Sequence, residues 1–245
     1  MPTAAAVIIG NEILTGKFQD ENGPWLIGRC RSIGLDMIRV SIIDDTVASI
    51  SDEVRRLSHL VDWVFTSGGV GPTHDDVTMS GIAAAFGVET KRNADLEALI
   101  RRHMGERVNE DALRMADIPD GSVLWQERSD RFPVVVCRNV IIFPGVPAYL
   151  QGKFDDIAHR LGGTPMVSQS LRTHLTEPEL ASTLREADLR WPHVAIGSYP
   201  RFDTQPRSVV ITFDSRDNEA LAACYGWVDD TLSAIERSAS QHHAP

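Results

Sequence analysis

Short apolar runs alternate with longer stretches of mixed polarity over the first two thirds of the chain. Apolar runs bounded by glycine, proline or acidic residues predict buried strands at residues 4–9, 35–43, 61–65, 134–137 and 139–143. Apolar positions that recur every three or four residues predict helices at residues 47–60, 77–86, 93–104, 109–116 and 148–161. They predict one further helix, which begins within residues 20–24 and ends at Gly34. Strands that alternate with helices in this way favour a parallel, right-handed βαβ architecture.

The pattern changes after residues 162–165, which we interpret as a domain boundary. The residues that follow predict a strand at 166–175, a helix at 177–189, strands at 193–199 and 208–213, and a helix at 219–238. This β-α-β-β-α order is typical of a small α+β domain with an antiparallel sheet. We therefore predict an α/β domain at residues 1–163, a small α+β domain at residues 164–240 and a disordered tail at residues 241–245.

Composition narrows the classes of partner. The 245 residues carry a formal net charge of −10, which argues against a nucleic-acid surface. The apolar runs are too short to span a bilayer, and the N-terminus lacks the basic region of a signal peptide, so we expect no membrane partner. Cys30, Cys137 and Cys224 lie far apart with no Cys-x-x-Cys, which favours a reduced, cytoplasmic protein.

The stretch from Thr66 to Thr78 carries the strongest chemical signal. It leads from a buried strand, through glycines and a proline, into a predicted helix. Such a turn exposes several backbone N–H groups in one direction, which suits a phosphate. Asp75 and Asp76 would repel that anion, so either they only cap the helix or a cation lies between them and the phosphate.

Two residues of this stretch also have ordinary structural explanations. The Thr73-x-x-Asp76 spacing is that of a capping box with Asp in place of Glu. His74 can be a metal ligand, a general base or, as most loop histidines are, a solvated side chain.

The loops at the ends of the predicted parallel strands should open on one edge of the sheet. These loops are residues 10–14, 43–46, 68–76 and 144–147. Their acidic residues would then gather around the glycine turn: Glu12, Asp45, Asp75 and Asp76. Alternatively, Glu12 bonds nearby backbone N–H groups, and Asp44 and Asp45 serve as helix caps.

Three motifs carry a resemblance to a known family: Gly10-Asn11-Glu12-Ile13-Leu14, the string from Thr66 to Thr78, and Phe143-Pro144-Gly145-Val146-Pro147. They resemble the molybdopterin-binding (MoaB/Mog-like) domain of the CinA type. Within that family the chain is most similar to the N-terminal domain of eukaryotic FAD synthase. The motifs behind this are Asp20-x-Asn22, Arg131-Phe132-Pro133, Arg138-Asn139-Val140 and Gly197-Ser198-Tyr199-Pro200.

The resemblance implies a three-layer α/β/α domain with a mostly parallel sheet, joined to a second, small α+β domain. It implies a nucleotide pyrophosphatase of the FAD or ADP-ribose class that uses a divalent metal, Co²⁺ or Mg²⁺, with K⁺ assisting. In related molybdenum-cofactor enzymes two aspartates act in adenylyl transfer, and they correspond to Asp45 and Asp76. Relatives are commonly oligomers, so we expect a homo-oligomer.

The chain departs from the family pattern in several places. Asn11 stands where relatives usually carry Thr or Asp, so a metal-ligand role is not carried over to it. The segment Arg131-Phe132-Pro133 replaces the Gly-Thr-Ala-Pro-Gly segment of many CinA proteins. No stretch resembles the CinA deamidase domain or the adenylyltransferase domain of FAD synthase, so we expect neither of those activities.

From these observations we expect metal-dependent hydrolysis of a dinucleotide-type diphosphate. The catalytic candidates are Asp45, Asp76 and His74, and the metal-ligand candidates are Asp75, Asp76 and Glu12. The candidates for binding the nucleotide substrate and its phosphate are Gly68, Gly69, Gly71, Pro72, Thr73, Gly10, Asn22, Pro144 and Gly145. The alternatives are a non-hydrolytic module that binds molybdopterin or a nucleotide, and adenylyl transfer to molybdopterin.

Overall fold

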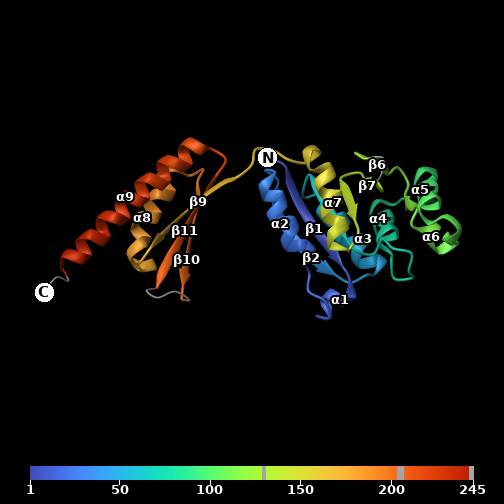
Figure 1. The fold of residues 1–245 in the computed structure, drawn as a ribbon, viewed down its shortest axis with the longest axis horizontal. Coiled ribbons are helices and arrows are strands. Elements are labelled where there is room, and N and C mark those ends of the chain that lie inside the picture. The colour runs from blue at the N-terminus through green and yellow to red at the C-terminus, as the bar shows by residue number, and fades with distance from the viewer. Residues whose placement is uncertain (129–130, 203–206, 243–245) are drawn as a thin grey trace. The chain divides into compact units, whose positions relative to one another are not determined.

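The computed structural model describes residues 1–128, 131–202 and 207–242, with side chains up to residue 238. The chain forms two compact units, residues 1–164 and residues 165–245 (Figure 1). Part of the loop predicted between the last two strands, residues 203–206, lies outside the described residues, as do residues 243–245 of the predicted tail. No helix among the described residues is long and apolar enough to cross a membrane.

The first unit is built on a six-stranded sheet in the order β2-β1-β3-β8-β7-β6. Neighbouring strands from β2 to β8 run parallel, and β7 runs antiparallel to both β8 and β6. The strands are β1 (Thr3–Ile9), β2 (Asp36–Ile43), β3 (Trp63–Ser67), β6 (Val123–Trp125), β7 (Val134–Cys137) and β8 (Val140–Phe143). This arrangement confirms the predicted mostly parallel α/β class.

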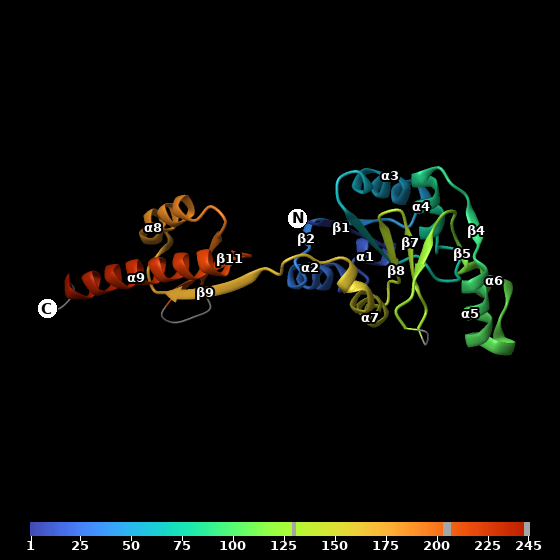
Figure 2. The ribbon, with the colours of Figure 1, turned by 90° about the horizontal axis from the view of Figure 1, so that it is seen from above.

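Helices cover both faces of this sheet. They are α2 (Asn22–Ser32), α3 (Val47–Ser58), α4 (Thr78–Phe86) and α7 (Pro147–Ile157), the last followed by the 3-10 turn η2 (Ala158–Arg160). The short helix α1 (Asn11–Leu14) buries no residue and follows directly after the end of β1. Side chains of β1 alternate between the faces. The odd-numbered residues from Ala5 to Ile9 pack with α3 and α4, and the even-numbered residues from Ala4 to Ile8 pack with α2 and α7. Figure 2 shows the resulting three layers.

Aromatic packing fixes the two strands that carry the glycine loops. The ring of Phe154 on α7 lies 5.5 Å from that of Phe65 on β3 and 6.0 Å from that of Phe143 on β8. All three side chains are fully buried. Truncating such a residue to alanine lowers the free energy of unfolding by about 3–5 kcal/mol. Phe154 of α7 therefore contributes strongly to holding β3 and β8 in place.

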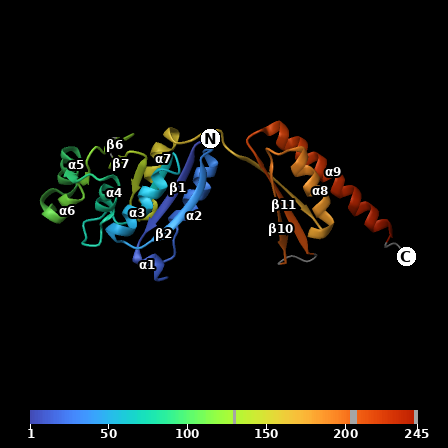
Figure 3. The same ribbon diagram turned by 180° about the vertical axis from the view of Figure 1, so that it is seen from behind.

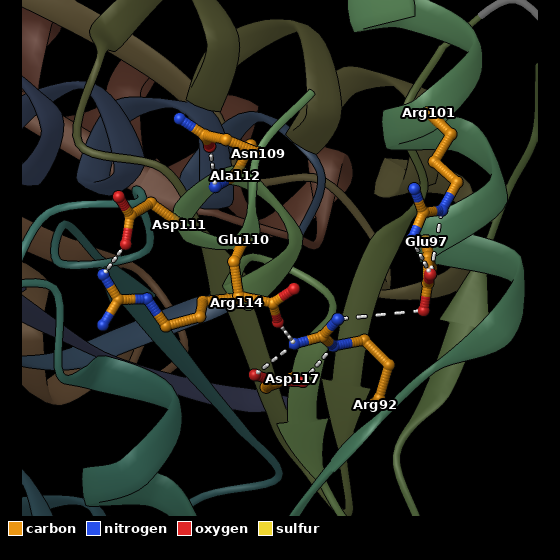
Figure 4. A network of polar contacts seen from close by, with 9 residues as sticks. All are labelled: Arg92, Glu97, Arg101, Asn109, Glu110, Asp111, Ala112, Arg114 and Asp117. Atoms are coloured by element: carbon orange, nitrogen blue, oxygen red, sulfur yellow. Dashed lines mark hydrogen bonds and ion pairs between the residues drawn. The ribbon is translucent and has the colours of Figure 1, made fainter. Parts of the chain in front are cut away.

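The segment between α4 and β6 forms a separate excursion. It comprises β4 (Thr90–Arg92), α5 (Ala94–Met104), the 3-10 turn η1 (Gly105–Arg107), α6 (Glu110–Arg114) and β5 (Asp117–Pro119). The strands β4 and β5 pair antiparallel and were not predicted. Arg92 joins them to the helices: its guanidinium pairs with Asp117, with Glu110 at 3.0 Å and with Glu97 at 3.8 Å (Figure 4).

The second unit is a three-stranded antiparallel sheet in the order β10-β11-β9, with two helices packed side by side on it (Figure 3). Its elements are β9 (Val167–Thr173), α8 (Glu177–Arg190), β10 (Ala195–Arg201), β11 (Ser208–Ser215) and α9 (Asn218–His242). This is the predicted small α+β fold. Helix α9 continues to His242, two residues into the tail predicted to be disordered.

Candidate functional site

Four parallel strands end at the same edge of the first sheet. Ile9 of β1 is paired with Ile43 of β2, and the preceding Ile8 is paired with Ser67 of β3. Ser67 in turn is paired with Phe143 of β8. The loops that follow these residues therefore leave the sheet side by side, as the sequence predicted.

The glycine loop after β3 is packed too closely for side chains. Gly68 has a φ of 105°, and a Cβ there would overlap the carbonyl oxygen of Ile9. Gly69 has a φ of 64°, and a Cβ there would clash with the Thr78 hydroxyl. That hydroxyl donates to the carbonyl oxygen of Gly68 at 2.8 Å, and the Thr78 amide donates to that of Gly69 at 3.0 Å. The first residue of α4 thus holds the loop by its carbonyl groups.

The amides of the loop differ in availability. The Gly68 N–H donates to the carbonyl oxygen of Phe143 at 3.3 Å, so this predicted phosphate donor is already engaged. The amides of Gly69, Val70 and Gly71 donate no hydrogen bond within the described part of the chain. These three consecutive groups, rather than Gly68, form the unsatisfied part of the loop.

Asp76 closes a turn in front of α4. Its carboxylate accepts hydrogen bonds from the amide of Thr73 at 2.8 Å and from the Thr73 hydroxyl, and its own amide donates to the Thr73 carbonyl at 3.2 Å. The helix begins only at Thr78, where Val77 is the N-cap and no side chain caps it. The predicted capping box is therefore a separate turn, and the Thr73 hydroxyl is not free to hold a phosphate.

The neighbouring pair His74 and Asp75 faces solvent. Their side chains are 97% and 60% exposed, and His74 Nδ1 lies 3.9 Å from Asp75 Oδ1. The Thr73 hydroxyl, which is shared with Asp76, and then the backbone amide of Asp75 itself hold the pKa of Asp75 below its ordinary value. Asp75 is therefore anionic at neutral pH, while no described residue comes close enough to His74 to fix its orientation. Pro72 is likewise exposed.

The loops after β1 and β2 are tied to each other. The Asn11 side-chain amide donates to the Asp45 carboxylate. The Glu12 carboxylate lies against Gly10, where a Cβ would overlap it. The Gly10 N–H donates to the Ile43 carbonyl at 3.2 Å, which engages another of the predicted substrate-binding residues. Asn11 thus orients a predicted catalytic carboxylate.

The predicted metal ligands are not assembled in advance. No group of three or more His, Cys, Asp or Glu side chains that could hold a metal ion occurs among the described residues. Asp45 is bonded by Asn11 and Asp76 by Thr73, and Glu12 lies over Gly10. The carboxylates therefore surround the edge without forming a metal centre by themselves.

Asn22 lies behind the glycine loop rather than on its surface. Its side chain is buried, and its amide nitrogen donates to Ser67 Oγ at 2.9 Å and to the Gly145 carbonyl at 2.7 Å. Ser67 Oγ also lies 3.5 Å from the Pro144 carbonyl. Ser67 and Thr78, both buried polar residues beside the glycines, were not singled out from the sequence. A polar residue at the end of an apolar strand was the available signal.

The Arg131-Phe132-Pro133 motif is fastened to α7. Lys153 on that helix donates to the carbonyl oxygens of Phe132 at 2.8 Å and Pro133 at 2.6 Å, and Arg131 pairs with Asp156 at 3.1 Å. Burial lowers the pKa of Lys153 to about 8. The motif that separates this chain from many CinA proteins therefore braces the helix that clamps β8.

Cysteine chemistry is not part of this site. All three thiols are buried, and burial raises the pKa of Cys30 to about 12. The pKa values of Cys137 and Cys224 are raised for the same reason. Buried thiols that stay protonated are poor nucleophiles.

The two units match two known families. Residues 5–163 match the family described as probable molybdopterin binding domain. Residues 165–238 match the family described as FAD synthase, middle domain. The division between the matches falls at the division between the two compact units.

Individual relatives agree with these matches. The chain is 32% identical to the probable FAD synthase of Caenorhabditis elegans, over 90% of this chain and 48% of that protein. It is 34% identical to a CinA-like protein of Mycobacterium sp. (strain MCS), over 76% of this chain and 49% of that protein. The chain thus spans about half the length of each of these relatives.

A solved structure has the same fold as the first unit. It is the crystal structure of the protein CinA, described as of unknown function, from Thermoplasma acidophilum. The similarity has a TM-score of 0.61 and 27% identity, and it covers 65% of this chain and 98% of that one. Since the first family match covers more than half of the chain, this protein belongs to the molybdopterin-binding-domain family, and its second unit is similar to the FAD synthase middle domain.

Proposed function

We propose that the first unit hydrolyses the diphosphate of a dinucleotide, of the FAD or ADP-ribose class. The observation that carries the proposal is the run of unsatisfied amides from Gly69 to Gly71 at the carboxyl ends of parallel strands. Consecutive backbone N–H groups beside a helix start bind phosphate oxygens. The names of the relatives add FAD as a candidate nucleotide.

The carboxylates present can bind a divalent ion only together with the phosphate oxygens of a bound substrate. Mg²⁺ is commonly held by one or two carboxylates together with phosphate oxygens, so it needs no group of three protein ligands. Asp75, anionic and exposed, and Asp76 are the residues that would hold it in this proposal. When bound, such an ion supplies charge neutralisation at the diphosphate and makes a neighbouring water more acidic.

The chain's own residues have the following roles in the proposed reaction. The amides of Gly69 to Gly71 hold one phosphate and fix its orientation. A water oxygen forms a bond to phosphorus while the bond from phosphorus to the bridging oxygen breaks, and the bridging oxygen leaves as part of a phosphate monoester. A carboxylate accepts the water proton, for which Asp76 is the first candidate and Asp45 the second. His74 is a weaker candidate to orient the water, because its side chain is almost fully exposed.

A panel of nucleotides tests the proposal. FAD, ADP-ribose and ADP are incubated with the full chain, and AMP release is measured with Co²⁺, with Mg²⁺, with either ion plus K⁺, and with EDTA. We expect AMP from FAD or ADP-ribose in the presence of a divalent ion and loss of turnover with EDTA. Turnover that EDTA leaves unchanged would rule out the metal-dependent form, and no AMP under any condition would rule out hydrolysis.

One observation favours a second candidate, a module that binds molybdopterin or a nucleotide without hydrolysis. The described residues hold no group of acids assembled for a metal, as a binding protein would not need one. Pterin fluorescence in the purified protein would support this candidate, and release of AMP from FAD would contradict it. Incubation with ATP and molybdopterin separates adenylyl transfer from both.

A further inference from the structure

The Asn22 side chain joins the end of β3 to the loop after β8 through two hydrogen bonds. Asn22 is the first residue of α2, its side chain is 5% exposed, and its amide joins Ser67 Oγ to the Gly145 carbonyl. Ser67 ends β3, and Gly145 belongs to the loop after β8. Asp20 fixes Asn22 in turn, because its carboxylate accepts the Asn22 backbone N–H at 2.9 Å.

The two segments joined by Asn22 touch each other directly. A Cβ on Gly145 would lie 3.3 Å from the Cα of Gly68, so backbone meets backbone at this point. On the other side of the loop, Thr78 holds the carbonyl groups of Gly68 and Gly69. The glycine loop is therefore held on two sides. Thr78 of α4 bonds its carbonyl groups directly, and Asn22 of α2 bonds Ser67 and Gly145, which lie next to it.

Two buried side-chain oxygens, one at the start of α2 and one near the end of β3 on the opposite face of the sheet, lack hydrogen-bond partners. Among the described residues only Asn22 Oδ1 and Thr66 Oγ1 are buried side-chain atoms that lack a hydrogen bond. Thr66 directly precedes Ser67 on β3. A buried oxygen without a donor is destabilising, and such atoms in native structures call for an explanation other than stability. At Asn22 the amide nitrogen supplies one, since it spans two loops of the site.

We propose that Asn22 is a positioning residue, which keeps the end of β3 and the Gly145 loop at the separation in which the amides of Gly69 to Gly71 can receive a phosphate. This inference rests on the proposed function for its ligand, but not on hydrolysis. It changes the role expected for Asn22 from direct contact with substrate to support of the loop that makes the contact. A shift of about 1 Å in such a loop can lower activity by roughly 100-fold.

The chain offers a matched control at the opposite edge of the sheet. The Asn139 side-chain amide also donates to two carbonyl groups, those of Ser58 at 3.0 Å and Val61 at 3.1 Å. Its backbone carbonyl accepts the Val64 N–H at 2.9 Å, near the start of β3. Asn139→Ala therefore removes the same number of hydrogen bonds from the same sheet, away from the loops.

The experiment compares Asn22→Ala and Asn139→Ala in the full chain. Binding of ADP in the presence of Mg²⁺ is measured by calorimetry, and amide hydrogen exchange is measured by NMR without ligand. We expect Asn22→Ala to raise the Kd for ADP roughly tenfold or more and to speed exchange of the Gly68 amide. We expect Asn139→Ala to leave ADP binding unchanged and to speed exchange of the Val64 amide instead.

Each outcome decides the inference. Equal ADP binding by Asn22→Ala and the wild type, or equal weakening by both variants, would overturn it. If Asn22→Ala does not fold, Ser67→Ala removes one acceptor of the Asn22 amide, and the same shifts are expected at smaller size. If the wild type binds ADP without releasing AMP from any nucleotide, hydrolysis fails and the Asn22 test stands. If the wild type binds no ADP, the hydrogen-exchange measurement decides. Faster exchange of the Gly68 amide in Asn22→Ala than in Asn139→Ala supports the inference, and equal exchange overturns it.

Discussion

At the scale of single residues, the glycine loop owes its shape to two contacts that exclude any side chain. Gly68 lies against the Ile9 carbonyl and Gly69 against the Thr78 hydroxyl. Both have positive φ, a conformation that glycine adopts without strain. Their carbonyl groups accept hydrogen bonds from Thr78, while the amides of Gly69 to Gly71 donate none within the described residues. Amides without a partner at a strand end are what the proposed phosphate site requires.

The substitution Asp76→Asn tests separately the two roles of Asp76, the turn that it closes with Thr73 and its proposed part in catalysis. The amide oxygen of asparagine can still accept the Thr73 N–H, so we expect the turn and the thermal stability to be retained. Because asparagine can neither accept the water proton nor offer a negative charge to the divalent ion, AMP release should fall by about 100-fold or more. Asp52→Asn, on the exposed surface of α3, is the control and should keep full activity. Wild-type turnover by Asp76→Asn would remove Asp76 from the mechanism.

Glu53 provides a pH-dependent test of the contact between β2 and α3. Hydrogen bonds from Arg56 and then Ser41 lower its pKa below the ordinary 4.5. The pKa of Glu53 is therefore lower in the folded state than in the unfolded state. Its contribution to the free energy of unfolding is complete above about pH 4.5 and is lost as the pH falls through the folded pKa. Glu53→Gln should destabilise the protein by roughly 1 kcal/mol at pH 7 and by progressively less under acid conditions. Urea unfolding from pH 3 to pH 7 measures the difference, and a constant difference would contradict the assignment.

At the scale of elements, the alternation of buried strands and amphipathic helices was enough to predict the sheet and the edge at which its strand-end loops lie side by side. The pattern failed where elements are short: Thr90–Arg92 has three residues, two of them charged, and Asn11–Leu14 is a single turn within an expected loop. Which loop amides remain free could not be predicted, because Gly68 is engaged by Phe143 across strand pairing. That pairing is set by register between segments far apart in sequence.

The Arg92 network determines how firmly the excursion of β4, α5, α6 and β5 is held. Arg92→Ala removes the pairs with Asp117, Glu110 and Glu97 together. We expect a loss of about 1 kcal/mol in the free energy of unfolding, since exposed pairs contribute at most about that much. Arg114→Ala, which removes only the pair with Asp111 within α6, should cost less.

Salt concentration provides the check on that prediction. The difference between the two variants should shrink as salt rises, because ions screen exposed charges. Urea unfolding at low and high salt measures it. Equal stabilities of the two variants at low salt would show that the network adds nothing to a single local pair.

At the scale of the whole molecule, each unit has its own core. The two apolar clusters on the faces of the first sheet draw all their residues from residues 1–164, and the third draws all of its residues from the second unit. A unit of this size buries enough apolar surface to fold alone. All the candidate site residues named above, and the residues that hold their loops, also belong to the first unit.

We therefore expect residues 1–164, produced alone, to fold cooperatively and to bind ADP with the affinity of the full chain. Circular dichroism on heating and calorimetry with ADP are the measurements, with the full chain as reference. A folded fragment that binds ADP more weakly would show that the second unit contributes to the site. An unfolded fragment would contradict the independence of the first core.

The candidate site needs the contact between the Gly68 loop and the Pro144–Gly145 loop. It can therefore form only late in the synthesis of the chain on the ribosome. Ser67 and Pro144 are 77 residues apart. At about 5–20 residues per second, the ribosome needs roughly 4–15 s to make that stretch. Over that interval β3 has no partner on the side of β8, and its apolar edge is open to mispairing. The nascent chain should thus acquire nucleotide binding only after β8 has emerged, so premature termination within the excursion yields a product with three paired strands and no site.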